Sequence, residues 1–395
     1  MLPTEMMSVY PEQPRERDRW ILSRRSQRNP VDPRRPHAFL VEEERAESGE
    51  IVSVATIFLT NRECPWRCLM CDLWKNTLME TAPTGAIPAQ IDFALAQLAD
   101  ADASPQHVSG ESSRVLTNAA TRQIKLYNSG SFFDPRAIPP ADYVAIAERV
   151  RVFVRVIVEC HPALIGDSAL EFRDLLKRTV STKPSAAECS ADFSPRPNIG
   201  GSAKRAEARA PSCHGAGSPR DVGGYAAKLE VAMGLETAHP QVLEKLNKRM
   251  TLDQFRRAAE FLRANDIALR VFVLVKPPFL EEAEALHWAK RSMDFAFDSG
   301  ATVVSLIPTR PGNGALDALA ERGEFSPPKL ATLEAALDYG IDLKRARVFA
   351  DLWDLESFSD CKECFERRRA RLHEMNLRQI TQPQVACECC RERTR

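Results

Sequence analysis

The chain has 395 residues, of which 44% are hydrophobic and 27% charged, and 54 basic against 54 acidic residues give a formal net charge of zero. This composition is typical of a folded globular protein and excludes a wholly disordered chain or a collagen-like fibre. Without net charge there is no global field to attract nucleic acid or an anionic membrane, so such a partner must meet a local patch. The sequence shows no secretory signal and no run of 18 apolar residues, which predicts a cytoplasmic protein without a membrane span.

Strands that alternate with helices are expected along most of the chain. Residues 1–50 are rich in arginine and proline and are expected to form an irregular N-terminal extension. The next segment, 51–60, is apolar and β-branched, as in a parallel strand covered on both faces. Further strands are expected at 124–128, 152–159, 229–235, 268–275 and 302–307, with helices at 89–101, 141–150, 169–177, 252–264 and 281–297. This alternation implies βαβ units and an α/β fold, with an open or partial barrel over 51–314.

Two stretches interrupt the alternation. Residues 181–224 consist largely of alanine, serine, glycine and proline and are predicted to be a disordered insertion within one crossover. Residues 104–121 resemble a milder case. Beyond the barrel, a helix is expected near 328–339, and 315–395 is expected to form a helical, cysteine-rich, metal-binding subdomain.

Eight of the eleven cysteines fall into two groups, and the first group follows the first strand. Cys64, Cys68 and Cys71 form a C-x3-C-x2-C run at the carboxyl end of that strand, the face that carries the active site in α/β barrels. Three thiolates this close together suit an iron–sulfur cluster with one iron left open for a substrate. The alternative is a structural zinc site, although zinc normally takes four ligands in paired knuckles.

The C-x3-C-x2-C run in this position resembles the signature of the radical S-adenosylmethionine (SAM) superfamily. The resemblance implies a partial (β/α)6 barrel in which Cys64, Cys68 and Cys71 hold a [4Fe-4S] cluster. It also implies that the open iron binds the amino and carboxylate groups of SAM. One electron from a ferredoxin- or flavodoxin-type donor then cleaves SAM to methionine and a 5′-deoxyadenosyl radical, which abstracts hydrogen from a substrate.

The same resemblance implies cofactor contacts after the second and fourth strands. Ser129, Gly130 and Ser131 stand where the family has a glycine-rich turn that holds the amino group of SAM, although a plain βα turn is the simpler interpretation. Glu236 and Lys248 take the places of a glutamine and an arginine that meet the carboxylate end of the cofactor in the coproporphyrinogen-dehydrogenase branch. Lys248 can still meet a carboxylate, whereas Glu236 would repel it and is expected to accept from ribose hydroxyls or the amino group.

Other reactive residues near the strand ends have simpler interpretations. Glu236 and Glu159 are alternatively expected to pair with neighbouring bases in the barrel mouth. His161 is expected to be a satisfied loop histidine, and Cys160 a small buried hydrophobe. The remaining isolated thiols lie in the predicted insertion and are expected to be incidental; they are Cys189 and Cys213.

The second cysteine group lies in the tail and comprises Cys361, Cys364, Cys387, Cys389 and Cys390. We expect a four-ligand metal site with one thiol to spare, first as a structural zinc site and second as an auxiliary iron–sulfur cluster. Five unrelated thiols are the third interpretation, because C-x-C-C is not a standard zinc knuckle. Residues 365–378 are expected to form a basic helix between the two halves.

The sequence therefore predicts a radical SAM enzyme whose substrate is undefined. Modification of tRNA is one hypothesis, because arginine runs could contact phosphates. These runs are Arg24–Arg25, Arg34–Arg35 and Arg367–Arg369. A small-molecule or peptide substrate is a comparable alternative, and a non-catalytic zinc-binding interaction protein is the alternative from another class.

Overall fold

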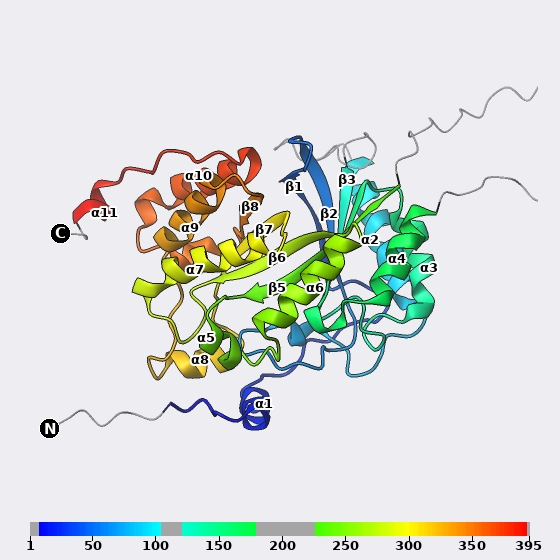
Figure 1. Cartoon of the computed structure of the whole chain (residues 1–395), viewed down its shortest axis with the longest axis horizontal. Coiled ribbons are helices and arrows are strands. Elements are labelled where there is room, and N and C mark those ends of the chain that lie inside the picture. The colour runs from blue at the N-terminus through cyan, green and yellow to red at the C-terminus, as the bar shows by residue number, and fades with distance from the viewer. Residues whose placement is uncertain (1–7, 104–120, 179–225, 393–395) are drawn as a thin grey trace, which may run out of the picture.

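A computed structural model describes residues 8–103, 121–178 and 226–392, in which eight strands form one sheet in the order of the sequence (Figure 1). The strands are β1 (Ala38–Arg45), β2 (Ile51–Leu59), β3 (Thr121–Asn128), β4 (Arg155–Glu159), β5 (Lys228–Glu236), β6 (Ala268–Val275), β7 (Val303–Pro308) and β8 (Arg347–Ala350). β1 pairs antiparallel with β2, and every later pairing is parallel. The sheet curls into a partial α/β barrel, as predicted.

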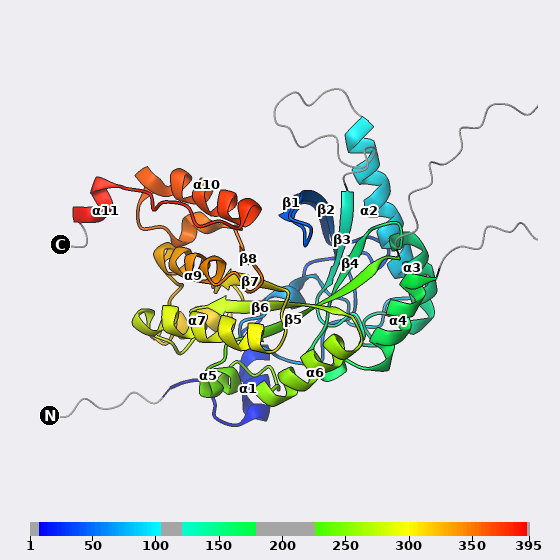
Figure 2. The same cartoon turned by 45° about the horizontal axis from the view of Figure 1, so that its top comes forward.

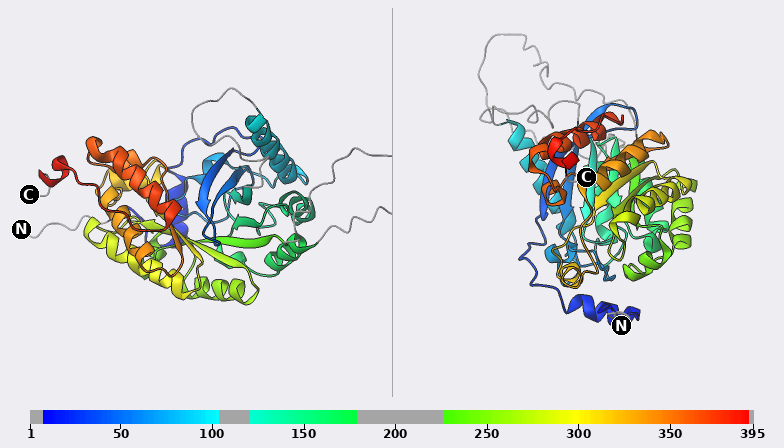
Figure 3. Two further views of the ribbon diagram at one scale, coloured as in Figure 1. Left: turned by 90° about the horizontal axis from the view of Figure 1, so that it is seen from above. Right: turned by 90° about the vertical axis from the view of Figure 1, so that its left-hand side faces the viewer.

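Helices connect the parallel strands and surround the curved sheet (Figures 2 and 3). They are α2 (Ala86–Ala103), α3 (Tyr143–Val150), α4 (Asp167–Lys177), α5 (Pro240–Lys245), α6 (Leu252–Ala264), α7 (Glu282–Asp298), α8 (Ala315–Ala320) and α9 (Leu330–Asp342), with α1 (Pro14–Leu22), α10 (Lys362–Arg378) and α11 (Glu388–Glu392) outside the crossovers. α6 shows why they form: Thr251 and Gln254 make a capping box at its start. Its apolar residues recur at helical spacing and are buried in the core. Among the described helices, none is long and apolar enough to cross a membrane.

All six predicted strands are present, but the expectation for residues 1–50 was wrong because that segment contains α1 and β1. In α1 the many arginines hide the helical pattern of its two apolar residues, Trp20 and Ile21, that pack against the protein. In β1 a run of acidic residues does not resemble the apolar pattern of a buried strand. β8 lies within the range assigned to the tail subdomain, yet it pairs with β7. The other domain boundaries stay predictions. The predicted insertion at 181–224 lies outside the described residues, as does 104–121 apart from its last residue, which opens β3.

The interior of the barrel holds a buried ionic network near the amino ends of the parallel strands. Arg270 contacts Glu44 of β1 at 2.5 Å and Glu230 of β5 at 2.7 Å. Lys125 contacts Glu44 at 2.6 Å, and Arg155 contacts Glu230 at 3.0 Å. Burial alone would raise the pKa of Glu44 and Glu230, but Arg270 and the other cations outweigh it and hold both values below the ordinary range. Glu44 of β1 therefore neutralises the buried cations Lys125 and Arg270. The network lies at the end of the barrel opposite to the carboxyl ends of the parallel strands.

Helix α10 packs against both edge strands, β1 and β8 (Figure 2). The side-chain amide of Asn376 accepts from the N–H of Ala350 and donates to its C=O, both at 2.9 Å. Gln379 does the same for Val348, at 2.7 and 2.8 Å. An edge strand exposes unpaired backbone groups, and here two side-chain amides pair with those of β8 as a further strand would.

Candidate functional site

Cys64, Cys68 and Cys71 lie in the loop that follows β2, here named the cysteine loop, at the carboxyl end of the barrel. Each thiol has another as an electrostatic neighbour: Cys71 acts on Cys64, Cys64 on Cys68 and Cys68 on Cys71. Burial raises the pKa of each thiol to about 12. The loop therefore holds three half-buried thiols near one another, and they stay protonated unless a metal replaces the proton.

Residues that follow α5 and β7 fix the loop. Leu69 donates its N–H to the C=O of Leu246, at 2.9 Å. The side-chain amide of Asn247 donates to Arg67 O at 2.8 Å, and that of Asn313 donates to Leu69 O at 2.7 Å. Sequence reasoning gave neither asparagine a role, although Asn247 directly precedes Lys248 in the motif that resembles the coproporphyrinogen-dehydrogenase branch and Asn313 lies in the Pro/Gly turn after the sixth predicted strand. The loop conformation is thus set by protein contacts.

Trp66 of the cysteine loop stacks on His161, which follows β4, with ring centroids 3.8 Å apart. Nδ1 of His161 accepts from the N–H of Ala163 at 3.1 Å, so Nε2 carries the proton that it shares with Lys248 O at 3.0 Å. Burial and the charge of Lys248 lower the pKa of His161 to about 3. The expectation of a satisfied loop histidine is confirmed, and its role is to connect the cysteine loop to the backbone of Lys248.

Lys248 and Glu236 form an ion pair in the barrel mouth. The register of β5 shifts between Gly234 and Glu236, and Glu236 has a left-handed backbone with φ 66°. Such bulges redirect side chains and are frequent beside active sites. A Cβ at Gly234 would overlap the ends of both charged side chains, so this glycine leaves the space that they occupy. The pair fits the simpler interpretation of Glu236, and a cofactor role for either residue stays a prediction.

The charge of Lys248 also reaches the cysteine loop. Lys248 is an electrostatic neighbour of Cys64 and Cys68. Burial would lower the pKa of Lys248, but Glu236 and the thiols outweigh it and the net shift is upward. A permanent cation therefore stands beside the thiols, where it can meet an anionic group.

The turn after β3 packs directly on the cysteine loop. Gly130 has φ 153°, and a Cβ there would lie 3.0 Å from the Cβ of Cys64. A side chain would therefore disturb the loop at its first cysteine. Ser131 accepts the N–H of His161 on its hydroxyl, at 2.9 Å, so this hydroxyl already has a structural role. Cofactor binding by Ser129, Gly130 and Ser131 stays a prediction.

Glu159 and Cys160 end β4 in different environments. Glu159 was expected to pair with a neighbouring basic side chain. Among the described contacts it instead accepts a hydrogen bond from the backbone N–H of Asn128, at 3.2 Å. Burial raises the pKa of Glu159 to about 8, against the opposing effects of Asn128 and Lys248. Cys160 is buried in the core, as expected. The two incidental thiols, Cys189 and Cys213, lie outside the described residues.

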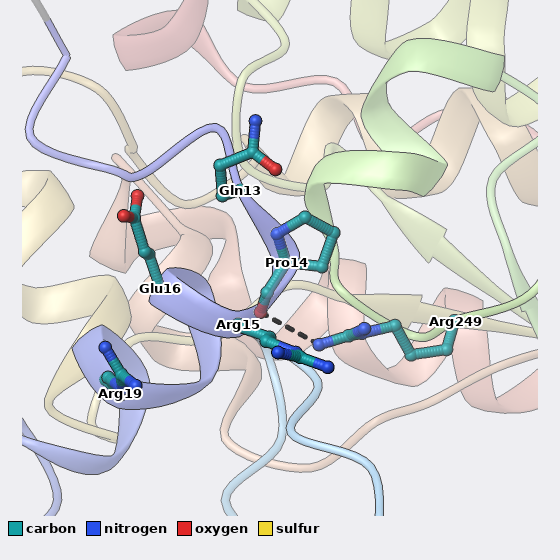
Figure 4. A pocket seen from close by; sticks show the side chains of 6 residues that line it. All are labelled: Gln13, Pro14, Arg15, Glu16, Arg19 and Arg249. Atoms are coloured by element: carbon teal, nitrogen blue, oxygen red, sulfur yellow. Dashed lines mark hydrogen bonds between the residues drawn. The ribbon is translucent and has the colours of Figure 1, made fainter.

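Helix α1 packs beside the segment that carries Lys248. Arg249 donates to the C=O of Pro14 and to Asp18, both at 2.8 Å. A pocket of about 500 Å³ opens there, between the start of α1 and Arg249 (Figure 4). Its lining comprises Gln13, Pro14, Arg15, Glu16, Arg19 and Arg249. The pocket is cationic, and none of the three loop cysteines lines it.

Two of the arginines proposed as phosphate contacts are used inside the protein. Arg25 contacts Glu63 at 2.7 Å and lies over the ring of Trp74. Arg368 makes a two-pronged contact with Glu334, at 2.7 and 3.0 Å. For these two the phosphate prediction was wrong, because each guanidinium is largely buried against its carboxylate. The remaining arginines of these runs are Arg24, Arg34, Arg35, Arg367 and Arg369, for which it stays a prediction.

The tail gathers four of its five cysteines. The sulfur atoms of Cys361, Cys364, Cys387 and Cys390 all lie within 4.8 Å of one another. Cys389 is outside this group in the part of the chain that the structure describes. Without it, both halves have C-x2-C spacing, so the irregular C-x-C-C pattern conceals two ordinary knuckles.

Comparison with known proteins gives local or weak similarities, and no family model matches the chain. An uncharacterized protein of Methanocaldococcus jannaschii is 21% identical over 376 residues, which cover 91% of this chain and 86% of that protein. Archaeosine synthase subunit beta of Methanosarcina acetivorans is 33% identical over 104 residues, 26% of this chain and 30% of that subunit. The subunit of Thermococcus kodakarensis is 35% identical over 104 residues, 26% of this chain and 32% of that subunit. The matches to these subunits thus span about a third of their length.

Several solved structures share part of the architecture. Methylornithine synthase (PylB) matches with a TM-score of 0.44 and 12% identity, over 85% of this chain and 74% of that one. Elp3 of Methanocaldococcus infernus matches with a TM-score of 0.42 and 13% identity, over 73% and 59%. The radical SAM methyltransferase TsrM of Kitasatospora setae matches with a TM-score of 0.38 and 15% identity, over 68% and 39%. At these values the comparisons do not place the chain in a family.

Proposed function

We propose that this protein is a radical SAM enzyme in which Cys64, Cys68 and Cys71 hold a [4Fe-4S] cluster. The observation that carries the proposal is the placement of three thiols, each an electrostatic neighbour of another, in one fixed loop at the carboxyl end of a partial α/β barrel. The donor set fits the group, since thiolates are the usual ligands of iron–sulfur clusters and three of them leave one iron open. The close approach of Gly130 to Cys64 fits a loop shaped around a compact cofactor.

Lys248 and Glu236 are the residues that we assign to the amino-acid end of SAM. The ammonium of Lys248 would meet the carboxylate, and the carboxylate of Glu236 would accept from the amino group or the ribose hydroxyls. A cluster bound in the cysteine loop would supply the electron that cleaves SAM to methionine and a 5′-deoxyadenosyl radical. A cytoplasmic setting and a ferredoxin- or flavodoxin-type electron donor belong to the same proposal.

For the substrate we propose tRNA. The names of the archaeosine synthase subunits point to modification of tRNA. The cationic pocket beside α1 adds an independent reason, because Arg15 and Arg19 line it beside Arg249, which is paired with Asp18 (Figure 4). Guanidinium groups are the usual partners of RNA phosphates. A backbone held at this pocket would bring a nucleoside toward the barrel mouth.

The cluster is tested by anaerobic purification, reconstitution with iron and sulfide, and electron paramagnetic resonance after reduction. We expect about four irons per chain in the cysteine loop and a reduced-cluster signal that changes when SAM is added. Cys389→Ser should retain the signal, and a variant with alanine at positions 64, 68 and 71 should lack it. A protein that binds zinc and no iron would refute the enzyme and favour a non-catalytic zinc-binding protein.

The RNA surface is tested by the salt dependence of tRNA binding. Arg15→Ala combined with Arg19→Ala should weaken binding and reduce the slope of log K against log salt concentration by about 2, one for each lost phosphate contact. The matched control is Arg256→Ala on α6, an arginine that pairs with Asp253. If the double arginine variant and Arg256→Ala bind tRNA with equal affinity, the pocket does not contact RNA.

A further inference from the structure

The four tail cysteines that gather in the structure have the dimensions of a single-ion site. Sγ of Cys361 lies 3.8 Å from Sγ of Cys387, and Sγ of Cys364 lies 3.6 Å from Sγ of Cys390. A tetrahedral zinc ion with bonds of about 2.3 Å sets its sulfur ligands about 3.8 Å apart. A four-iron cluster needs each thiolate on a different iron, which holds the sulfur atoms farther apart. The observed spacing therefore favours one ion over an auxiliary cluster.

The start of α10 favours negative charge at the first cysteine pair. Cys361 is the N-cap of α10 and Cys364 lies in its first turn, where the helix dipole favours negative charge. Both are almost fully buried, with 2% and 1% of their surface exposed. Arg368, one turn further along α10, is an electrostatic neighbour of Cys364. A zinc ion with four thiolates carries a net charge of about −2, which the start of the helix offsets in part.

The tail returns along α10 to bring the two cysteine pairs together. Gln379 ends α10 in a left-handed conformation with φ 54°, which reverses the chain. Arg371 then donates to the C=O of Gln382 at 2.7 Å and of Pro383 at 3.0 Å. The segment after α10 runs beside this helix toward α11 in Figures 1 and 2. The second cysteine pair thereby reaches the start of the helix.

We propose that Cys361, Cys364, Cys387 and Cys390 bind one Zn²⁺ in a closed tetrahedral site that fastens the tail to α10. All four positions are filled by protein, so the site is structural and has no open coordination position for a substrate. The site would hold the tail against α10, the helix whose Asn376 and Gln379 form hydrogen bonds with the edge strand β8. In Figure 1 this helix lies above the strands β5, β6 and β7, whereas α1, α5 and α8 lie below them.

The metal is identified in a full-length variant with alanine at positions 64, 68 and 71, because within the described part of the chain the tail group is then the remaining candidate metal site. We expect about one zinc per chain, and after replacement by Co²⁺ the visible absorption of tetrahedral cobalt with four thiolates. Cys361→Ser and Cys390→Ser should each abolish zinc binding, whereas Cys389→Ser, which alters a neighbouring thiol of the same short helix, should keep it.

Several results would overturn the proposal, and none of them depends on the barrel cluster. They are a metal-free chain with reduced thiols, a chain with disulfides in place of metal, iron and sulfide in the tail, or equal loss of zinc in Cys389→Ser. The proposed role of zinc in holding the tail against α10 is tested separately, by amide hydrogen exchange of residues 380–390. Chelation of zinc should accelerate exchange there, and unchanged exchange would contradict the role in holding the tail.

Discussion

The indole ring of Trp66 stacks on the imidazole of His161 with an interplanar angle of 11° and a centroid separation of 3.8 Å. The contact joins the cysteine loop to the end of β4. Because His161 also donates to Lys248 O, one neutral ring positions both the loop and the residue that we assign to the carboxylate of SAM. The cysteine loop is therefore held in place through contacts that do not require a metal.

Trp66→Leu should accelerate loss of the cluster. An aromatic stack contributes about 0.5–1.5 kcal/mol beyond burial, which corresponds to roughly a two- to tenfold faster release of iron to a chelator. The measurement is the decay of the cluster absorbance under anaerobic chelation. Trp353→Leu is the matched control, since Trp353 is 65% exposed. A cluster in Trp66→Leu that decays at the wild-type rate would show that the stack does not hold the loop.

Lys248→Met should weaken binding of SAM through loss of the carboxylate contact. Glu236→Gln is combined with it so that no buried carboxylate is left unpaired. A hydrogen bond to a charged group contributes about 1.5–3 kcal/mol, so Kd for SAM should rise roughly ten- to hundredfold. Decarboxylated SAM provides the control ligand, because its affinity should change little relative to Glu236→Gln alone. If both ligands weaken equally, Lys248 does not contact the carboxylate.

Glu159 should make the free energy of unfolding depend on pH. Its pKa is about 8 in the folded protein and 4.5 ordinarily, so between these values unfolding releases a proton from Glu159. This group therefore lowers stability progressively as pH rises from 4.5 to 8, by at most about 5 kcal/mol. Glu159→Gln should be stabilising at pH 8.5 and nearly neutral at pH 5.

Urea denaturation of the cluster-free protein at these two pH values measures the effect of Glu159→Gln. Glu260→Gln, on the exposed face of α6, is the control. Its free energy of unfolding should differ from that of the wild type by the same small amount at both pH values. A stability gain in Glu159→Gln that is independent of pH would mean that the folded protein holds this carboxyl at its ordinary pKa.

Gln379→Ala should destabilise the edge of the barrel. The substitution leaves the N–H and C=O of Val348 without their partner on α10. Loss of a partner for a buried polar group costs about 1–3 kcal/mol. Chemical denaturation checks the value, with the exposed Gln241→Ala as control. Equal stability of the two variants would show that water replaces the amide at no cost.

The hydrophobic pattern predicts the parallel strands and places the cysteine loop because both features are local in sequence. The rest depends on distant contacts. The acidic sequence of β1 fits a buried strand because Glu44 pairs with Arg270, which lies more than 200 residues away in sequence. A local pattern does not show this pairing. The exclusion of Cys389 from the tail group likewise requires the three-dimensional path of the tail.

The residues of the barrel mouth illustrate the same limit. The family resemblance implied cofactor contacts for Glu236 and Lys248, and the simpler interpretation paired Glu236 with a base but did not identify it; the structure shows that this base is Lys248, beside a bulge in β5. The expected base for Glu159 was replaced by the backbone of Asn128, because strand alignment decides which donor reaches a buried carboxyl.

Formation of 5′-deoxyadenosine from SAM by the anaerobically reconstituted and reduced protein tests the central claim most directly. The account predicts that wild-type protein and Cys389→Ser release it in amounts that match their cluster content. Cys64→Ser, Cys68→Ser and Cys71→Ser should each release none while keeping a folded barrel by circular dichroism. Wild-type protein with a complete cluster that leaves SAM intact, or full cleavage by any one of the three variants, would contradict the account.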